Sequence, residues 1–345
     1  MKRLAIIILN WNGSAMMRRY LPSVIANSEG DVIVADNAST DDSLLMLQSE
    51  FPNVRTIVMD ENYGFAEGYN RALAAVRGEY RYAVLLNSDV EIRQQGWDTI
   101  LADYMDLHSE CAACMPKLLN LRLLEADPQS HPQFEYAGCA GGFLDRYGYP
   151  FCRGRIFSTV EEDHGQYDTT IPVLWATGAA MLVRMDDYFA ARGLDSRFFA
   201  HMEEIDLCWR LRIMGCQIVC LPQSTAYHLG GASLNYGNPR KTFLNFRNNL
   251  LMLYKNLDRS ELVSVLAVRF LLDLVAALQM LLTGQFQHAL SVVRANVAFY
   301  SIRHEWKEER QRIQASRQAA DIPERRSFSI LWKYYARGKK KFSDL

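Results

Sequence analysis

The stretch Ala83–Ile92 reads AVLLNSDVEI, and it decides how the rest of the chain is interpreted. An apolar run leads into Asn87, Ser88 and Asp89, after which apolar residues resume. In open α/β sheets, ligands bind outside the carboxyl ends of the strands, so a carboxylate that follows a buried strand is well placed to bind one. We interpret Asp89 as a metal ligand. Asn, Ser and Asp also favour turns, so this stretch alone is equally compatible with an ordinary turn.

Upstream of this stretch, short apolar runs alternate with segments of helical periodicity. The runs at 4–9, 31–35, 54–59 and 82–86 predict strands. The segments at 17–26, 43–50, 67–76 and 97–107 predict helices, with Ser39 or Asp41 as the cap of the second. This alternation predicts an open, mostly parallel sheet with right-handed crossovers and helices on both faces, which is an α/β fold.

The composition indicates a soluble globular protein large enough for one large domain or two ordinary ones. The chain has 345 residues and a formal net charge of −1, so no general attraction to nucleic acid is implied. Its seven cysteines form no disulfide framework, which suits a reducing cytosol. We interpret Cys111 and Cys114, an isolated CxxC pair, as buried thiols rather than zinc ligands. The run at 4–9 is too short for the core of a signal peptide.

The pattern loosens after residue 107. Residues 134–155 have little periodicity, and a long irregular stretch of this kind is usually functional or covers a substrate. A strand at 174–184, a helix at 205–214, and strands at 217–221 and 225–228 are predicted next. We place a domain boundary before Pro239, so that residues 1–238 form the first domain.

The remainder, 239–345, is predicted to be a helical extension with a basic, aromatic tail. Residues 262–282 are long enough to span a bilayer. However, Arg269 and Asp273 lie one turn apart in the middle, and each costs about 2.5–3.5 kcal/mol at the bilayer centre. A membrane-surface helix or a packed lid is therefore favoured over a span. The tail at 325–341 suits anionic lipid at the cytoplasmic face of the membrane, although a solvated tail explains it too.

Two common nucleotide signatures are missing from the sequence. The loop after the first run contains only Gly13, so there is no dinucleotide fingerprint, and no GxxxxGK[ST] loop occurs. These absences argue against a dehydrogenase and a phosphate-loop nucleotidase.

Four polar segments fall at the predicted strand ends: Asn10–Gly13, Asp36–Asp41, Asn62–Asn70 and Asn87–Asp89. Their arrangement resembles the family 2 glycosyltransferases, which have a GT-A fold, and in particular the bacterial branch of rhamnosyl- and galactofuranosyl-transferases. The resemblance extends over about residues 3–250. It implies that residues 1–238 are a catalytic domain, with a nucleotide-sugar part at about 1–115 and an acceptor part at about 116–238. It implies that the nucleotide sugar is bound by Asn10, Asp36, Asn62, Gly64, Asn70, Asn87 and Ser88. The other interpretations are a turn or cap at Asp36 and a helix-start turn at Asn62–Asn70.

The resemblance also implies a metal site. Asp89 matches the family's last metal-binding Asp, and Asn87 stands where Asp is usual, which leaves the site lighter in charge. His228, in the segment Tyr227–Gly231, matches a His that binds the metal or the diphosphate. Oxygen and imidazole ligands suit Mg or Mn. A lone His would more often be structural.

The segment Phe198–Arg210 resembles the family's stretch that carries the catalytic base. Glu204 matches the base, with Glu where Asp is usual, and Glu203 and Asp206 remain alternatives. Acidic residues at a helix start also complement the helix dipole, and Asp206 has i,i+4 spacing to Arg210.

On the acceptor side, the resemblance places Trp175, Thr177 and Gly178 along the site. Arg153 and Arg155 could attract an anionic, lipid-diphosphate acceptor, but a solvated loop explains them equally well.

Together with the resemblance, these residues lead us to expect an inverting, metal-dependent transferase. It would move a sugar from a dTDP- or UDP-linked donor to a hydroxyl of a glycan or lipid-linked glycan, in cell-surface polysaccharide assembly. We expect a cytoplasmic enzyme in peripheral contact with the inner face of the membrane. Two alternatives remain. One is a nucleotidyltransferase on a related sheet, which would carry a basic, Gly-rich first loop. The other is a non-catalytic nucleotide-sugar binder.

Overall fold

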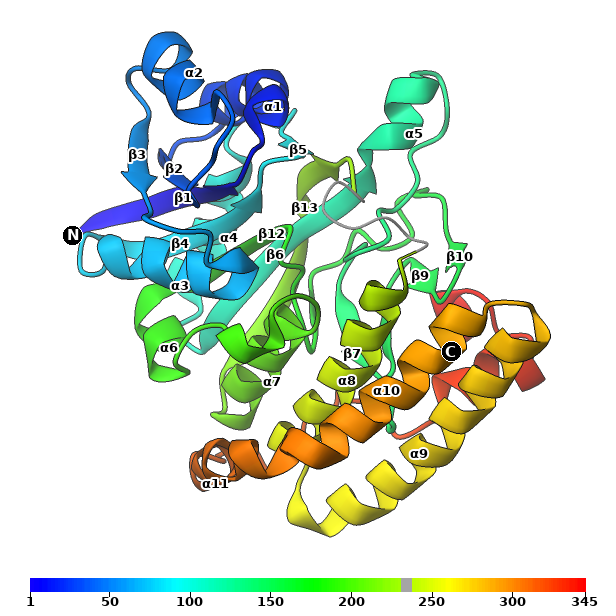
Figure 1. The fold of residues 1–345 in the computed structure, drawn as a ribbon. Helices are drawn as coiled ribbons and strands as arrows, with labels where there is room; N and C mark the ends of the chain where they lie inside the picture. The colour runs from blue at the N-terminus through cyan, green and yellow to red at the C-terminus, as the bar shows by residue number, and fades with distance from the viewer. Residues whose placement is uncertain (231–237) are drawn as a thin grey trace.

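The computed structural model describes residues 1–230 and 238–345. A nine-stranded sheet forms the centre, in the order β11-β13-β6-β12-β4-β1-β2-β3, with β5 paired to β13 (Figure 1). Its strands are β1 (Lys2–Asn10), β2 (Asp31–Asp36), β3 (Arg55–Val58), β4 (Tyr80–Asn87), β5 (Val90–Glu91), β6 (Cys111–Asn120), β11 (Ile171–Pro172), β12 (Ala180–Arg184) and β13 (Gln217–His228). β4, β1, β2 and β3 run parallel, and antiparallel β12 lies between β4 and β6.

Helices cover both faces of this sheet, as the sequence predicts. Alternate residues of β1 enter two cores, because successive side chains of a strand point to opposite faces. One core packs under α1 (Ser14–Asn27), α2 (Ser43–Glu50) and α4 (Trp97–Leu107). The other packs under α3 (Gly64–Ala75), α6 (Met185–Ala190), α7 (Glu203–Ile213) and α8 (Pro239–Asn256). The predicted mostly parallel α/β architecture with helices on both faces is confirmed.

Several predicted elements differ from the structure. The predicted strand at 174–184 begins only at Ala180, and the two strands at 217–221 and 225–228 form one strand, β13, with a shift in register between Leu221 and Thr225. The residue at the N-cap position of α2 is Asp42. Its side chain makes no capping hydrogen bond, whereas Asp41 Oδ1 accepts from the Ser43 amide at 3.0 Å.

The stretch at 134–155, predicted to be irregular, contributes to a second, four-stranded antiparallel sheet. Its strands are β7 (Gly142–Leu144), β8 (Pro150–Cys152), β9 (Arg155–Ile156) and β10 (Thr159–Val160). These strands have two or three residues each, which is too short for a periodic pattern to show. The small sheet lies between the central sheet and the C-terminal helices (Figure 1).

The C-terminal region is helical as predicted, with α9 (Arg259–Leu282), α10 (Phe286–Ile302) and α11 (Lys307–Ala315) after α8. α9 and α10 form an antiparallel hairpin that packs on α8. By length and composition, α9 alone among the described helices could cross a membrane. However, Arg269 and Asp273 are both 1% exposed and face the protein. The charges that counted against a span in the sequence are therefore paired inside the fold.

Candidate functional site

Asp89 and His228 lie together because β5 pairs with the end of β13. His228 is in register with Val90, next to Asp89, and its Nε2 lies 3.1 Å from Asp89 Oδ1. Both residues are buried, and Asn87 Nδ2 lies 3.4 Å from the same imidazole nitrogen. Gly231, the last residue of the predicted His segment, lies outside the described residues. Two residues 139 positions apart in sequence thus form one polar pair at the end of β4.

Asp89 and His228 each favour the charged form of the other side chain. Burial raises the pKa of Asp89, but the hydrogen bond from His228, the positive charge of His228 and backbone hydrogen bonds together lower the net pKa. Burial lowers the pKa of His228, but the negative charge of Glu135 and the hydrogen bond to Asp89 raise it to about 10. Glu135 Oε1 approaches His228 Nδ1 at 3.4 Å. This corner of the site carries two carboxylates around one imidazole.

A divalent cation fits the Asp89–His228 pair when His228 is neutral, because the imidazolium that its raised pKa favours cannot ligate a metal. The cation would then have two protein ligands. Neighbouring ligands at about 2.1 Å from an octahedral cation are about 3.0 Å apart, close to the observed spacing of the oxygen and the nitrogen. Within residues 1–230 and 238–345, no cluster of three or more His, Cys, Asp or Glu side chains could hold a metal. The remaining ligands would therefore be water and phosphate oxygens, which Mg²⁺ commonly keeps.

His228 also lines a cavity of about 540 Å³ between the central sheet, the small sheet and α8. Glu204, Trp175, His201 and Arg155 line the same cavity. Buried polar atoms normally have hydrogen-bond partners. Here Glu204 Oε2, His201 Nε2 and Arg155 Nε are buried and have none. Unpaired polar atoms of three side chains around one cavity indicate a place for a polar ligand.

The three acidic candidates at the start of α7 have different surroundings. Glu204 lines the cavity, and burial raises its pKa. Glu203 lies outside the cavity lining, and burial, followed by repulsion from Glu204, raises its pKa well above the usual value. Asp206 is fully buried on the other side of the helix, where it accepts from Arg210 Nε, Lys255 Nζ and Asn256 Nδ2, each at 2.8 Å. The i,i+4 ion pair expected for Asp206 and Arg210 forms.

The turn before α7 has an unusual backbone that the sequence did not reveal. Phe199, His201 and Met202 have φ values of 68°, 70° and 75°, in the left-handed region that non-glycine residues rarely adopt. Asn248 of α8 holds this turn, since its Nδ2 donates to the carbonyls of Phe198, Ala200 and His201 at 2.8–2.9 Å. Sequence reasoning missed Asn248, because no local signal links it to the turn some fifty residues before it.

The predicted acceptor residues lie close to Glu204 but differ in exposure to the cavity. Trp175 lines it, with Nε1 donating to the Phe143 carbonyl at 3.1 Å. Gly178 lies beside Glu204, because a Cβ built on it would come within 3.7 Å of Glu204 Cβ. Thr177 is buried and outside the lining, where its Oγ1 accepts from the Ala179 amide.

The predicted nucleotide residues form a second polar group at the ends of β1 and β2. Asp36 is fully buried and accepts from Asn10 Nδ2 at 3.0 Å and from the Ser39 amide at 2.9 Å. Asn10 Oδ1 is buried without a partner. The parallel pairing of Asn10 with Asp36 in the sheet explains the contact.

The Asn62–Asn70 segment divides into two parts. Asn62 Oδ1 accepts from the Gly64 amide and from Asn37 Nδ2, at 2.9 and 3.0 Å, so this part joins the group around Asp36. Sequence reasoning missed Asn37, although it adjoins Asp36. Asn70 instead bridges α3 to the segment after α6. Its Oδ1 accepts from Tyr188 and the Leu194 amide, and its Nδ2 donates to the Leu194 carbonyl.

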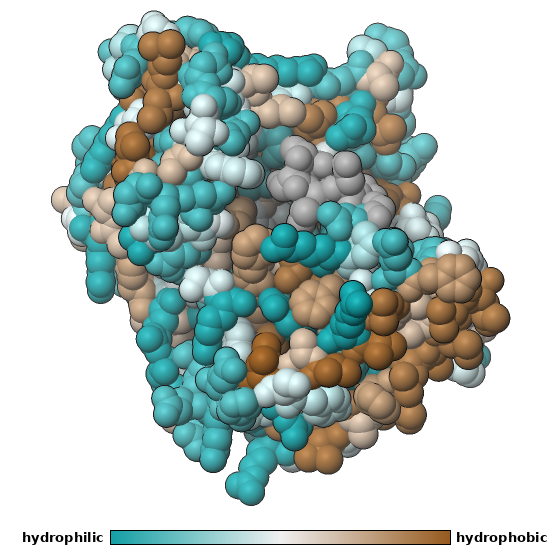
Figure 2. All heavy atoms as spheres, in the orientation of Figure 1, coloured by the Kyte–Doolittle hydropathy of each residue, from teal (hydrophilic) through white to brown (hydrophobic). Residues whose placement is uncertain are grey.

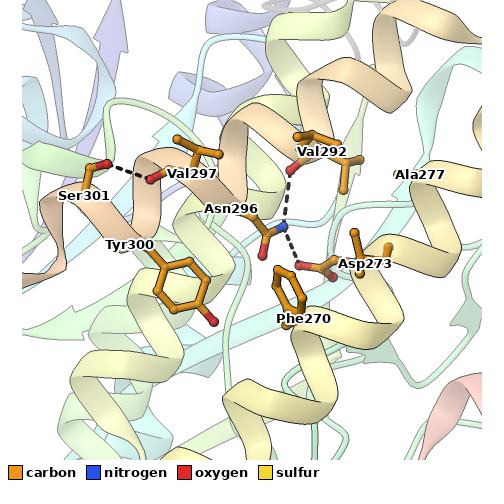
Figure 3. Close-up of a pocket in the computed structure, with 10 residues that line it drawn as sticks. Phe270, Asp273, Ala277, Val292, Asn296, Val297, Tyr300 and Ser301 are labelled. Carbon is orange, nitrogen blue, oxygen red and sulfur yellow. Dashed lines mark hydrogen bonds between the residues drawn. The ribbon is translucent and has the colours of Figure 1, made fainter.

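A further, apolar cavity of about 500 Å³ lies between α9 and α10 (Figure 3). Phe270, Val292 and Val297 line it, and Asp273 and Asn296 lie between the two helices. Asn296 Nδ2 donates to Asp273 Oδ2 at 3.1 Å, whereas Asn296 Oδ1 is buried without a hydrogen-bond partner.

Comparison with known sequences finds a family match in the N-terminal part of the chain. Residues 5–158 match the family Glycosyl transferase family 2. An N-acetylglucosaminyl-diphospho-decaprenol L-rhamnosyltransferase of Mycobacterium tuberculosis is 25% identical over 240 residues, which cover 65% of this chain and 75% of the relative. Rhamnosyltransferase WbbL of Escherichia coli K12 is 26% identical over 267 residues, which cover 75% of this chain and 94% of WbbL.

Solved structures share the fold at low sequence identity. GalNAc-T7 with UDP, GalNAc and Mn²⁺ matches with a TM-score of 0.57 and 12% identity over 74% of this chain, which spans about half of that protein (48%). TarS 1–349 of S. aureus with UDP matches with a TM-score of 0.51 and 14% identity over 91% of this chain and 88% of that one. The GT-A fold expected from the sequence is confirmed.

Proposed function

Because the chain carries a family 2 glycosyltransferase domain of the rhamnosyltransferase-like branch, we propose that it transfers a sugar from a dTDP- or UDP-linked donor to a hydroxyl of a lipid-linked glycan, with inversion. The observation that carries this proposal is the cavity. It is lined both by Glu204, whose Oε2 is buried without a hydrogen-bond partner, and by His228, which is hydrogen-bonded to Asp89. A base and a metal-binding pair on one cavity can serve the two ends of one displacement.

In the proposed reaction, Glu204 acts as the general base. The acceptor hydroxyl gives its proton to Glu204 Oε2 while its oxygen attacks the anomeric carbon from the side opposite the diphosphate. The bond between that carbon and the diphosphate oxygen breaks, and inversion results. A base placed in this way contributes roughly a hundred- to ten-thousand-fold in rate. Its raised pKa suits the role, because a carboxylate with a higher pKa is a stronger base.

Asp89 and His228 would hold a divalent cation, Mg²⁺ or Mn²⁺. Such a cation neutralises the charge that develops on a leaving diphosphate. Asn10, Asp36 and the Asn37–Asn62 pair would hold the nucleoside. A buried carboxylate such as Asp36 accepts well from a ribose hydroxyl or from the imide N–H of uracil or thymine. Trp175 and Gly178 would flank the acceptor beside Glu204.

The test compares two adjacent glutamates. Glu204→Gln keeps the size of the side chain and removes the base, whereas Glu203→Gln makes the same change outside the cavity lining. We expect release of nucleoside diphosphate in the presence of acceptor to fall roughly a hundredfold or more in Glu204→Gln only. Donor binding, followed by thermal shift, should be retained in both. Equal loss in both variants, or full activity in Glu204→Gln, would reject Glu204 as the base.

We also propose that α9 and α10 rest on the cytoplasmic surface of the membrane. Their outer faces expose many large apolar residues, with Leu282 80% and Phe286 66% exposed at the turn between the helices. Figure 2 shows this apolar surface on the side of the molecule formed by the hairpin. An apolar patch of this extent on a soluble domain marks an interaction site. A bilayer is the occupant that a lipid-linked acceptor would bring with it.

A further inference from the structure

Arg155 lines the cavity with an incomplete set of partners. The residue is 6% exposed, and its ring neighbour Tyr136 lies 4.3 Å from the guanidinium carbon. Its Nη1 and Nη2 reach only the Phe157 carbonyl at 3.5 Å and the Cys152 thiol at 3.4 Å, and its Nε has no partner. Among the described residues, no carboxylate lies within ion-pair distance of it. A buried guanidinium with five donors is normally paired with an acceptor of opposite charge.

Arg153, two residues earlier in the turn between β8 and β9, is an arginine whose side-chain nitrogens all have hydrogen-bond partners. It is buried to a similar degree, at 3% exposed, but it lies outside the cavity lining. Its Nε donates to the Ala140 carbonyl at 3.0 Å, and its Nη2 donates to the Thr169 carbonyl at 2.9 Å. Arg153 therefore ties loops together. Arg155 offers its donors to the cavity instead.

We propose that Arg155 binds a phosphate group of the acceptor, next to the sugar whose hydroxyl faces Glu204. A guanidinium presents a planar fork of donors that matches phosphate oxygens two at a time. The ring of Tyr136 holds the plane of that fork. The donor's own diphosphate has a separate partner in the Asp89–His228 corner, which leaves Arg155 for a second anion. The inference rests on the proposed function and assigns the acceptor class, a lipid-linked phosphate or diphosphate, to a residue of this cavity.

Binding of simple probes tests this inference without knowledge of the acceptor sugar. Farnesyl diphosphate and farnesol share one isoprenoid chain and differ in the diphosphate. Their affinities for the full-length protein are measured by calorimetry in EDTA, so that no cation at Asp89 and His228 can bind the diphosphate. We expect wild type to prefer farnesyl diphosphate by about tenfold to a hundredfold, the range for hydrogen bonds to charged groups.

Variants separate the two arginines and the two anion sites. Arg155→Gln should abolish the preference, and Arg155→Lys, which keeps the charge but loses the fork, should reduce it. Arg153→Lys and Asp89→Ala should keep it. No preference in wild type, or a preference that survives Arg155→Gln, overturns the inference. If Arg155→Gln fails to fold, Arg155→Lys decides between these outcomes.

The proposed function is measured separately on the same proteins, by UDP and dTDP binding in Mn²⁺. If wild type binds neither UDP nor dTDP, the proposed transferase function is rejected. The farnesyl diphosphate result is unaffected by that outcome. If Arg155→Gln instead weakens UDP binding and spares farnesyl diphosphate, the anion that Arg155 binds is the donor's, and the inference fails.

Discussion

His228 Nε2 and Asp89 Oδ1 are 3.1 Å apart, and the backbone of two strands keeps them so. β5 has only two residues, yet its pairing with β13 places His228 opposite Val90, directly after Asp89. The Leu229 amide also donates to the Asp89 carbonyl at 3.0 Å. Main-chain hydrogen bonds on both sides of the pair thus fix the positions of the two residues. A change of side chain at either residue leaves these backbone hydrogen bonds in place.

Replacing Asp89 by Ala should therefore remove metal-dependent activity without unfolding the protein. We expect transfer in Mn²⁺ to fall by on the order of a hundredfold or more, since losing even an outer partner of a metal ligand costs 10–100-fold. Initial rates with and without EDTA measure the effect. Wild-type rates that are equal in EDTA and in Mn²⁺ would contradict the metal site.

The pH profile should report the environment of Glu204. Because burial raises its pKa, the general base becomes ionised at a higher pH than an ordinary Glu, whose pKa is about 4.3. We expect kcat to rise with pH through that raised pKa, and the acid limb to disappear from the residual activity of Glu204→Gln. An acid limb at the ordinary pKa in wild type would show that the base lies elsewhere.

Glu203→Gln should stabilise the protein at neutral and alkaline pH. The folded state raises the pKa of Glu203, so it binds the proton more tightly than the unfolded chain does. Stability contributed by this residue is complete below about pH 4.3 and declines as pH rises above it. Thermal unfolding at pH 8 should favour Glu203→Gln by on the order of 1 kcal/mol, and the difference should vanish near pH 4. A variant less stable than wild type at both pH values would disagree with this.

Asn248→Asp should uncouple the turn before Glu204 from α8. The carboxylate keeps the shape of the side chain but cannot donate to the three carbonyls that Asn248 holds. We expect a loss of roughly 2–3 kcal/mol in unfolding free energy, about 1 kcal/mol for each hydrogen bond. We also expect a lower kcat with unchanged donor affinity, because Asn248 holds the left-handed turn that leads into Glu204. Unchanged kcat would leave Asn248 a purely structural residue.

Membrane contact should depend on the tip of the α9–α10 hairpin. Leu282→Glu with Phe286→Glu should abolish co-flotation with liposomes of bacterial lipid, because both side chains are largely exposed there. Leu45→Glu is the matched control. Leu45 is 68% exposed on α2, within the nucleotide half of the chain. Equal flotation of both variants would place the contact elsewhere.

The sequence predicts best where one local pattern determines one element. The strands β1 and β2 and the helix α2 are predicted correctly, because packing in or against the central sheet alone determines the spacing of their apolar residues. β6 was missed, although it lies in the middle of the sheet. Its sequence CAACMPKLLN contains a proline and a lysine. Lys117 is buried only because Asp163 and Asp168 each pair with it at 2.6 Å, and local sequence cannot reveal partners so distant.

The candidate site shows the same contrast between local patterns and distant contacts. Motif residues at strand ends, such as Asp36 and Asp89, are found because the carboxyl ends of parallel strands share one edge. The partial satisfaction of Arg155, the full satisfaction of Asp206 and the position of Asn248 depend on contacts between distant segments. No spacing rule in the sequence encodes those contacts.

The inward-facing pair on α9 makes the order of folding matter. Arg269 donates to Asn249 of α8 and to the Tyr147 carbonyl, and it lies 3.3 Å from Asp273. If the nascent helix met lipid before those residues had assembled, it would bring two charges that each cost about 2.5–3.5 kcal/mol at mid-bilayer. Assembly of Arg269 with Asn249 and Tyr147 before any contact with lipid would bury both charges, so the hydropathy of the segment alone does not determine where it lies.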